Sequence, residues 1–249
     1  MTSLIVIPAR LHSTRLPEKL LLAETGKPLI QHTYESAQKA TRPAGIIVAA
    51  DHQRIADAVE SFAGTVVMTD PKAPSGTDRV AEVAQDLPHV DIIVNVQGDE
   101  PDISGDAIDM VVALLENNPD AVMATLATPI RDKRQLQDPA CVKVVFDHQQ
   151  RAMYFSRSTI PHTRDWNDQL LEAEPAHFHQ HIGLYAYRRE FLLSLTDLPQ
   201  SEVEKLESLE QLRVLSHGYK ILVGVIDEPS IGIDTQEDYE AFVRLLRNR

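Results

Sequence analysis

Cysteine is almost absent from this sequence, since Cys141 is the only one among 249 residues. A lone cysteine cannot form an intramolecular disulfide, so no disulfide framework stabilises the chain, and the composition fits a reducing compartment. The sequence also lacks a basic amino-terminal segment followed by a long apolar run and a cleavage site. Its first apolar run, residues 4–9, is too short for a signal peptide or a membrane span. We therefore expect a soluble, cytoplasmic protein.

Basic residues are scarce, with 24 lysines and arginines against 37 aspartates and glutamates and a net charge of −13. General binding to nucleic acid or to an anionic membrane needs a basic face, so we expect neither partner. The apolar fraction of 43% is ordinary for a globular protein, and a chain of this length can bury a core without staples.

Two common nucleotide-binding motifs are also missing. The sequence has no Gly-x-Gly-x-x-Gly, which argues against the usual dinucleotide fold, and no Gly-Lys-Ser/Thr, which argues against a P-loop ATPase. It has no linker rich in glycine, serine or proline, and no internal repeat. We therefore expect a single domain over residues 1–249, with an inserted lobe at roughly residues 151–190.

What the sequence does contain is an alternation of short apolar runs with segments of helical spacing. The expected strands are residues 4–9, 45–50, 65–68, 91–96, 122–128, 142–146, 151–155, 181–187 and 220–226. The expected helices are residues 28–40, a helix capped by Asp51, and residues 77–84, 107–115, 202–216 and 235–246. Residues 142–146 and 151–155 are expected to pair as a hairpin, and residues 160–176 to be irregular. The alternation predicts an α/β fold, with a parallel sheet covered by helices on both sides.

Clustered cations follow the first expected strand. Arg10 and Arg15 can each grip phosphate oxygens with a forked guanidinium, and Lys19 adds a mobile point charge. Ser13 and Thr14 can complete such a cradle. In an open α/β sheet ligands bind at the carboxyl ends of strands, and this loop lies at such an end. A solvated basic turn explains the same residues about as well.

Carboxylates follow two later strands. Asp99 comes directly after Gly98 at the end of an apolar run, where it could hold Mg²⁺ against phosphates. Asp234 precedes the last helix and could join it, and two aspartates with a cationic loop make a metal–nucleotide site. An acidic turn at Asp99 and ordinary helix capping at Asp234 are the alternative interpretations.

Other polar clusters could bind the rest of a substrate. The sequence Ser75-Gly76-Thr77 suits a base, ribose or phosphate at a helix start, or is simply a capped helix. The remaining candidates could line a polar pocket or be structural: residues 154–157 and 181–185, Glu207, Glu210, Gln211 and Arg213.

Taken in order, a set of short segments resembles the 3-deoxy-manno-octulosonate cytidylyltransferases (CMP-KDO synthetases). The segments are residues 7–10, 13–17, Lys19, and residues 26–28, 75–79, 95–101, 154–157, 181–185, 209–213 and 234–235. Each motif alone is weak, because related sugar nucleotidyltransferases share the first one. The complete set, running over nearly the whole chain, is specific.

The resemblance implies a nucleotide-diphosphate-sugar transferase (GT-A-like) sandwich with a mostly parallel sheet, whose small lobe helps to form a homodimer. It implies that CTP and KDO react with Mg²⁺ to give CMP-KDO and pyrophosphate, for lipopolysaccharide biosynthesis. The catalytic residues would be Arg15, Lys19 and Asp99, and the metal ligands Asp99 and Asp234. The nucleotide would contact Ala9, Arg10, Thr14, Arg15, Lys19, Ser75, Gly76, Thr77, Arg79 and Gly98. The sugar would face Gln97, Arg157, His181, Tyr185, Glu210 and Gln211.

The sequence departs from the family pattern at Glu18, where glycine is expected, and at His162, where an aromatic residue is common. Two alternatives stay open: a sister enzyme for sialic acid or an amino variant of KDO, and a nucleotide-binding relative without catalysis. The presence of Asp99 and Asp234 together with Arg15 and Lys19 favours catalysis.

Overall fold

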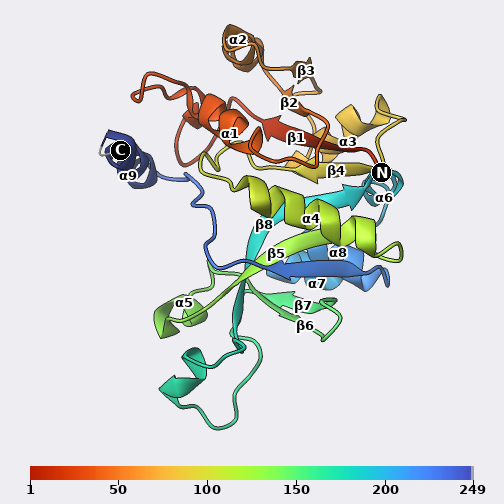
Figure 1. Cartoon of the computed structure of the whole chain (residues 1–249), viewed down its shortest axis with the longest axis vertical. Coiled ribbons are helices and arrows are strands. Elements are labelled where there is room, and N and C mark those ends of the chain that lie inside the picture. Colours follow the sequence, from red (N-terminus) through yellow and green to blue (C-terminus); the bar gives the residue numbers. More distant parts are fainter. Residues whose placement is uncertain (248–249) are drawn as a thin grey trace.

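The computed structural model describes residues 1–247, and Figure 1 shows the arrangement of its helices and strands. The strands are β1 (Ser3–Ala9), β2 (Ile46–Ala50), β3 (Val66–Met68), β4 (Ile92–Asn95), β5 (Met123–Pro129), β6 (Lys143–Phe146), β7 (Ala152–Ser156), β8 (His179–Arg188) and β9 (Ile221–Val225). The helices are η1 (Lys19–Leu21), α1 (Leu29–Ala37), α2 (Gln53–Ser61), α3 (Gly76–Gln85), α4 (Gly105–Asn117), α5 (Lys133–Gln137), η2 (Asp168–Leu171), α6 (Arg189–Leu195), α7 (Glu202–Glu207), α8 (Gln211–Ser216) and α9 (Gln236–Arg247).

A mixed sheet with the strand order β3-β2-β1-β4-β8-β5-β9 forms the centre of the molecule. β1 pairs in parallel with β2 and β4, and β5 pairs in parallel with β9. β8 runs antiparallel to both of its neighbours, β4 and β5. The main sheet is therefore mostly parallel, and the predicted fold class is confirmed.

Helices cover both faces of the sheet, which explains why its strands are continuous apolar runs. On one face α1, α2 and α4 pack on the sheet with side chains such as Ile30 and Val111, and α9 joins the same apolar cluster beside α1. On the other face α3, α6 and α8 pack with side chains such as Val80 and Leu212. Figure 1 shows α4 lying across the sheet. Within residues 1–247, none of the helices has the length and apolar character needed to span a membrane.

A smaller body extends from one end of the sheet, in the lower part of Figure 1. It contains the predicted hairpin, in which β6 and β7 pair antiparallel around the turn after Phe146. A separate small core, with Leu136, Cys141, Leu171 and Phe178, lies beside it. The expectation that residues 151–190 act as a sugar-binding and dimerisation lobe stays a prediction.

Residues 202–216 form two helices, so the prediction of one helix there is wrong. Ser208 has a φ of 53°, in the left-handed region that ends helices, and it separates α7 from α8. The break changes which side chains face the core, so Leu206 is 83% exposed while Leu212 is buried. It also frees the Glu207 carboxylate, which accepts hydrogen bonds from Ser156 Oγ at 2.6 Å and from the Arg157 amide at 2.9 Å.

The predicted capping role of Asp51 is also wrong. His52 is the N-cap of α2, and its Nδ1 accepts a hydrogen bond from the Arg54 amide at 3.1 Å. The Asp51 carboxylate instead accepts from the Leu11 amide at 2.9 Å. Asp51 therefore supports the loop after β1 rather than the helix that follows β2.

The carboxyl-terminal segment returns to the amino-terminal loop. After β9 the chain runs back along the molecule and places α9 beside α1 (Figure 1), where the rings of His32 and Phe242 lie 5.2 Å apart. The Tyr239 hydroxyl accepts a hydrogen bond from the Glu24 amide at 3.0 Å. This contact holds the first and last parts of the chain together near the ends of β1 and β4.

Candidate active site

A polar cavity of about 420 Å³ opens where β1 and β4 end. It gathers most of the cationic and acidic residues that the sequence singled out. Its lining is Pro8, Arg10, His12, Ser13, Thr14, Arg15, Lys19, Leu20, Gly76, Gln97, Gly98, Asp99 and Asp234. The carboxyl edge of the parallel strands thus carries a site rich in charges of both signs, as expected for α/β sheets.

Lys19 connects the two aspartates that line this cavity. Its Nζ donates hydrogen bonds to Asp99, to Asp234 Oδ1 at 3.0 Å and to the Ile233 carbonyl at 2.9 Å. Burial lowers the pKa of the Lys19 ammonium, but hydrogen bonds and charge from the two aspartates outweigh it, so the pKa is raised above its ordinary value. Lys19 is therefore a permanent cation between two carboxylates.

The Gly98 turn brings Asp99 close to the loop after β1. A Cβ atom at Gly98 would lie 3.1 Å from the Pro8 carbonyl oxygen, so only glycine allows this approach without a shift. The Gly98 carbonyl accepts a hydrogen bond from Thr33 Oγ1 at 2.9 Å, which fixes the turn on α1. A buried turn with both contacts positions Asp99 rigidly.

Asp234 is free of the capping role that was its alternative interpretation. Thr235 caps α9, since its Oγ1 accepts from the Asp238 amide at 3.2 Å, and the Asp238 carboxylate accepts in return from the amides of Thr235 and Asp234. The Asp234 carboxylate instead faces Lys19 and forms an ion pair with Arg15 at 3.0 Å. The structure thus brings the predicted residues Arg15, Lys19, Asp99 and Asp234 together.

The two aspartates fit a divalent cation. The ammonium of Lys19 reaches both carboxylates at once, so one positive centre can satisfy the pair. Among residues 1–247 no group of three or more histidines, cysteines or carboxylates could hold a metal. A cation here would depend on two carboxylates and on substrate oxygens, which is the ligand set that Mg²⁺ commonly takes.

A second cavity of about 330 Å³ adjoins the first, and Gly76 and Gln97 line both. Its other lining residues are Thr77, Asn95, Met123, Val142, His181, Tyr185, Tyr187, Leu195, Ser208, Leu209, Glu210, Gln211 and Val214. Antiparallel pairing places Tyr185 opposite Asn95, so β8 adds its side chains beside the carboxyl end of β4. Five of the six residues expected to face the sugar therefore line this second cavity. They are Gln97, which also lines the first cavity, and His181, Tyr185, Glu210 and Gln211.

His181 and Tyr185 are both uncharged in this cavity. Burial lowers the pKa of His181 to about 3, so the imidazole is neutral. Thr125 Oγ1 lies 3.0 Å from His181 Nε2, so the two side chains share a hydrogen bond. Burial, with the charges of Glu210 and Glu100, raises the pKa of Tyr185 above its ordinary value. Both side chains can act as neutral hydrogen-bonding groups.

The start of α3 connects the two cavities. Ser75 is the N-cap of α3, since its Oγ accepts from the Asp78 amide at 3.1 Å. Thr77 Oγ1 donates to Glu210 Oε2 at 2.9 Å. Ser75, Thr77 and Glu210 also line a smaller hollow of about 190 Å³. The turn expected to bind the nucleotide, at Thr77, is therefore in direct contact with Glu210, which is expected to face the sugar.

Three predicted residues lie outside the linings of these cavities. Arg79 is fully buried, with Nη1 on Thr69 and Nη2 3.8 Å from Asp51. The Arg157 guanidinium is bound to backbone carbonyls, including that of Glu207 at 2.8 Å. Ala9 is buried at the end of β1. Their expected roles stay predictions, and these contacts give Arg79 and Arg157 structural partners.

Sequence analysis missed two buried charges that support the second cavity. Glu204 is buried and forms an ion pair with the half-buried Arg213 at 2.6 Å, which joins α7 to α8. Lys143 is fully buried, and its Nζ donates to the carbonyls of Asp138, Cys141 and Arg157. The sequence did contain a signal for each. Glu204 belongs to a Ser-x-x-Glu helix start at Ser201, and Lys143 lies within an apolar run.

A cationic cavity with a carboxylate pair, adjoining a polar cavity at the edge of a mostly parallel sheet, suits the transfer of a nucleotidyl group. The comparisons with known proteins agree, since the model of the cytidylyltransferase family matches residues 4–221. The chain belongs to the 3-deoxy-manno-octulosonate cytidylyltransferase (CMP-KDO synthetase) family. It is an enzyme of the nucleotidyltransferase class.

Three relatives illustrate this membership. The chain is 48% identical to a 3-deoxy-manno-octulosonate cytidylyltransferase of Rhodopirellula baltica, over 100% of both chains. It is 46% identical to an 8-amino-3,8-dideoxy-manno-octulosonate cytidylyltransferase of Shewanella woodyi, over 96% of both. A solved CMP:2-keto-3-deoxy-manno-octonic acid synthetase complexed with CTP has a TM-score of 0.92 and 40% identity, covering 100% of this chain and 99% of that one.

Proposed function

We propose that this enzyme transfers the cytidylyl group of CTP to 3-deoxy-manno-octulosonate, giving CMP-KDO and pyrophosphate for lipopolysaccharide biosynthesis in the cytoplasm. The observation that carries the proposal is the pair of adjoining cavities, one with Lys19 between Asp99 and Asp234, the other lined by His181 and Tyr185. The names of the relatives support the choice of substrates.

In this proposal the first cavity binds the triphosphate. Arg10, Arg15 and Lys19 provide its cationic side chains, and Thr14 lines it as a hydroxyl donor. Asp99 and Asp234 would hold Mg²⁺, which would neutralise phosphate charge and favour ionisation of the attacking hydroxyl. The start of α3 at Gly76 lies between the two cavities and would receive the cytidine side of the nucleotide.

The second cavity would hold the sugar acid next to the α-phosphate. The anomeric oxygen would form a bond to the α-phosphorus as the bond to the bridging oxygen of pyrophosphate breaks, and the hydroxyl proton would pass to water. Such a displacement needs charge neutralisation and alignment more than a covalent nucleophile. Arg15 and Lys19 would stabilise the leaving pyrophosphate. Gln97, which lines both cavities, would contact the reacting groups at their junction.

The metal assignment is tested with Asp99→Asn. This variant keeps the size of the side chain but removes a negative charge, and we expect kcat to fall about a hundredfold or more. Calorimetric titration of the CTP-bound protein with Mg²⁺ should show weaker binding at the same time. Asp120→Asn is the matched control, because Asp120 is exposed and pairs only with Lys220 at 3.3 Å. Unchanged turnover in Asp99→Asn would contradict the assignment.

The sugar is tested with a panel. Purified enzyme is given CTP with KDO, 8-amino-3,8-dideoxy-manno-octulosonate or sialic acid, and pyrophosphate release is measured. We expect release with KDO. The amino sugar is the second candidate, because relatives from Shewanella species are named for it. A higher kcat/KM with the amino sugar than with KDO would identify it as the substrate. Release with sialic acid alone would refute both.

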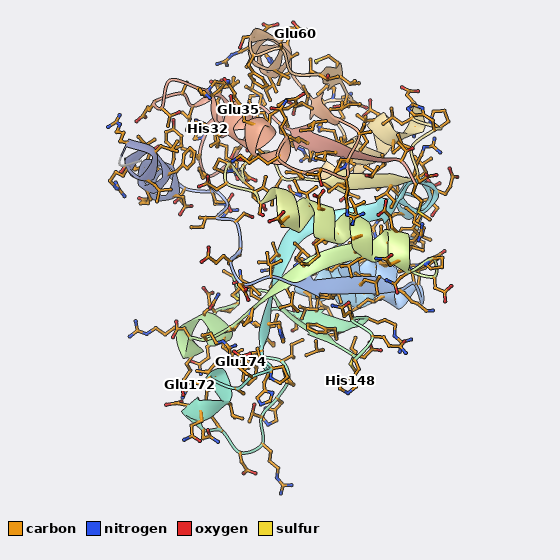
Figure 2. All side chains as sticks on the ribbon, viewed as in Figure 1. His32, Glu35, Glu60, His148, Glu172 and Glu174 are labelled. Atoms are coloured by element: carbon orange, nitrogen blue, oxygen red, sulfur yellow. The ribbon has the colours of Figure 1, made fainter. Side chains whose placement is uncertain are left out.

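We also propose that the enzyme is a homodimer formed through the small body that carries β6 and β7. A groove of about 880 Å³ lies there, with apolar side chains that include Phe146, Met153 and Ile160, and Met153 is 66% exposed. Glu174, which Figure 2 labels in this body, lines the groove and pairs with Arg131. An apolar groove with an exposed methionine is suited to a second copy of the chain.

The oligomeric state is measured by analytical ultracentrifugation. We expect a dimer, and Met153→Asp should shift it toward monomer. Met68→Asp is the control, because Met68 is 48% exposed but lies on β3 at the far edge of the sheet. A wild-type monomer, or equal effects of the two substitutions, would refute the proposal.

A further inference from the structure

Glu18 has an unusual backbone conformation beside the anion-binding cavity. Its φ is 51° and its ψ is 29°, in the left-handed region that residues with a side chain rarely adopt. Its carbonyl accepts a hydrogen bond from the Leu21 amide at 2.9 Å, so this residue starts the helical turn η1. The turn begins at Lys19, whose ammonium enters the cavity. Backbone strain is thus placed directly before the central cation of the site.

The Glu18 side chain is not among the residues that line the cavity, and its carboxylate is bound by Arg54 of α2. Both of its carboxylate oxygens accept from the Arg54 guanidinium, through Nη1 and, at 2.7 Å, through Nη2. Two parallel hydrogen bonds of this kind fix direction as well as distance. Arg54 lies in the first turn of α2, 36 positions along the chain from Glu18.

This ion pair has little to do with global stability. The side chains are 53% and 41% exposed, and exposed pairs contribute little to folding because water and salt screen them. Its location is more informative. A carboxylate released here would be next to a cavity that Arg10, Arg15 and Lys19 make attractive to phosphate. His12, which lines that cavity, is close enough to help lower the pKa of Glu18, after the larger effect of the Arg54 hydrogen bond.

We propose that Arg54 is a positioning residue for the triphosphate: it holds and neutralises Glu18 outside the lining of the anion cavity, so that no unpaired carboxylate is added beside the cations that would bind the phosphates. Arg54 acts through Glu18 and does not itself line the cavity. The proposal rests on the proposed function only for the identity of the nucleotide, because the cavity itself is defined by its cations.

The test compares Arg54→Ala, Glu18→Gln and the double variant. Glu18→Gln keeps the backbone strain but removes the charge, so it separates electrostatics from conformation. We expect Arg54→Ala to raise KM for CTP about three- to tenfold, as one extra charge near a polyanion at partial screening would. KM for the sugar should change less than about twofold. The double variant should regain the KM for CTP of Glu18→Gln, since no charge is left to be held.

A second measurement needs neither turnover nor the correct sugar. Binding of inorganic tripolyphosphate is titrated by calorimetry, and Arg54→Ala should weaken it by the same factor. The loss should shrink in about 0.5 M potassium chloride, which a purely structural defect would not show. If tripolyphosphate responds as described but CTP is not a substrate, the proposed function fails while this inference stands.

Arg42→Ala is the matched control, because Arg42 forms a comparable exposed pair with Glu116 at 2.7 Å away from the cavity. It should leave tripolyphosphate binding within about twofold of wild type. Equal affinity in Arg54→Ala and wild type would overturn the inference. So would a double variant as impaired as Arg54→Ala, because Arg54 would then act on the anion directly or through the fold.

Discussion

Lys19 Nζ lies 3.0 Å from Oδ1 of Asp234, although 215 positions separate the two residues in the sequence. Lys19 also donates to Asp99, so its ammonium takes the position between the two carboxylates that suit a divalent cation. If the proposed Mg²⁺ binds there, lysine and metal would compete for one pair of aspartates in the free enzyme. A triphosphate in the same cavity would draw the ammonium to its oxygens and release the pair.

The first prediction follows from this competition. Without nucleotide, Lys19→Met should bind Mn²⁺ or Mg²⁺ about tenfold more tightly than wild type, because the competing cation is gone. In the same variant, affinity for CTP should fall. Isothermal titration calorimetry measures both quantities. Lys220→Met removes an exposed lysine that pairs with Asp120 and should change neither. Weaker metal binding in Lys19→Met would contradict the competition.

The second prediction concerns Arg15. Its side chain is 67% exposed at the cavity and pairs with Asp234, so it can turn to a phosphate at little structural cost. Arg15→Ala should raise KM for CTP about tenfold or more and leave KM for the sugar acid within about twofold. Steady-state kinetics with each substrate varied in turn gives both values, and Arg151→Ala is the control at a distant exposed pair. Comparable changes in the two KM values would refute separate cavities for the two substrates.

The third prediction concerns pH. Burial lowers the pKa of His181 to about 3 in the folded protein, below the value of about 6.5 for an unfolded chain. The neutral ring therefore stabilises the fold above about pH 6.5, and this contribution is lost as pH falls from there toward 3. Between about pH 7 and pH 5, wild type should lose about 2 kcal/mol more stability than His181→Asn. Urea unfolding at the two pH values measures the difference, and equal losses would show that His181 becomes charged without cost.

The fourth prediction concerns the break between α7 and α8. Ser208 has a φ of 53°, which costs a residue with a Cβ atom more than it costs glycine. Relief of the left-handed penalty of about 1–2 kcal/mol exceeds the entropy cost of glycine, so Ser208→Gly should raise the free energy of unfolding by about 0.5–1 kcal/mol. Ser208→Ala keeps the Cβ atom and should show no gain. A loss of stability in Ser208→Gly would mean that the serine side chain contributes something that the backbone argument omits.

The strands could be predicted from the sequence, and so could the meeting of the cationic loop with Asp99. Both depend on local signals. Buried parallel strands are continuous apolar runs, and ligands gather where such strands end, so Lys19 and Asp99 could be expected to meet. The left-handed conformation of Ser208 has no sequence signature, and leucines on both sides of it kept a helical spacing. The burial of Arg79 could not be predicted either. The sequence at the start of α3 indicates the capping residue, but it does not indicate which face of the helix packs on the sheet.

The departure at Glu18 is explained by its partner rather than by its own position. A glycine is expected where φ is 51°, and a glutamate there carries both strain and charge. Arg54 lies on another element and is related to Glu18 only by the fold. Compensation of this kind joins two residues that no local pattern connects.

The return of the chain from β9 to the first loop has a consequence for synthesis. Asp234 and the Ile233 carbonyl, which hold Lys19, follow all nine strands of the sheet in the sequence. A nascent chain can therefore assemble its sheet on the ribosome while the charged centre is still incomplete. Lys19 and Asp99 could pair with each other before Asp234 has been synthesised. Under the proposed function, a chain truncated before Asp234 would keep the strands of the sheet but lack one of the two carboxylates that bind Lys19.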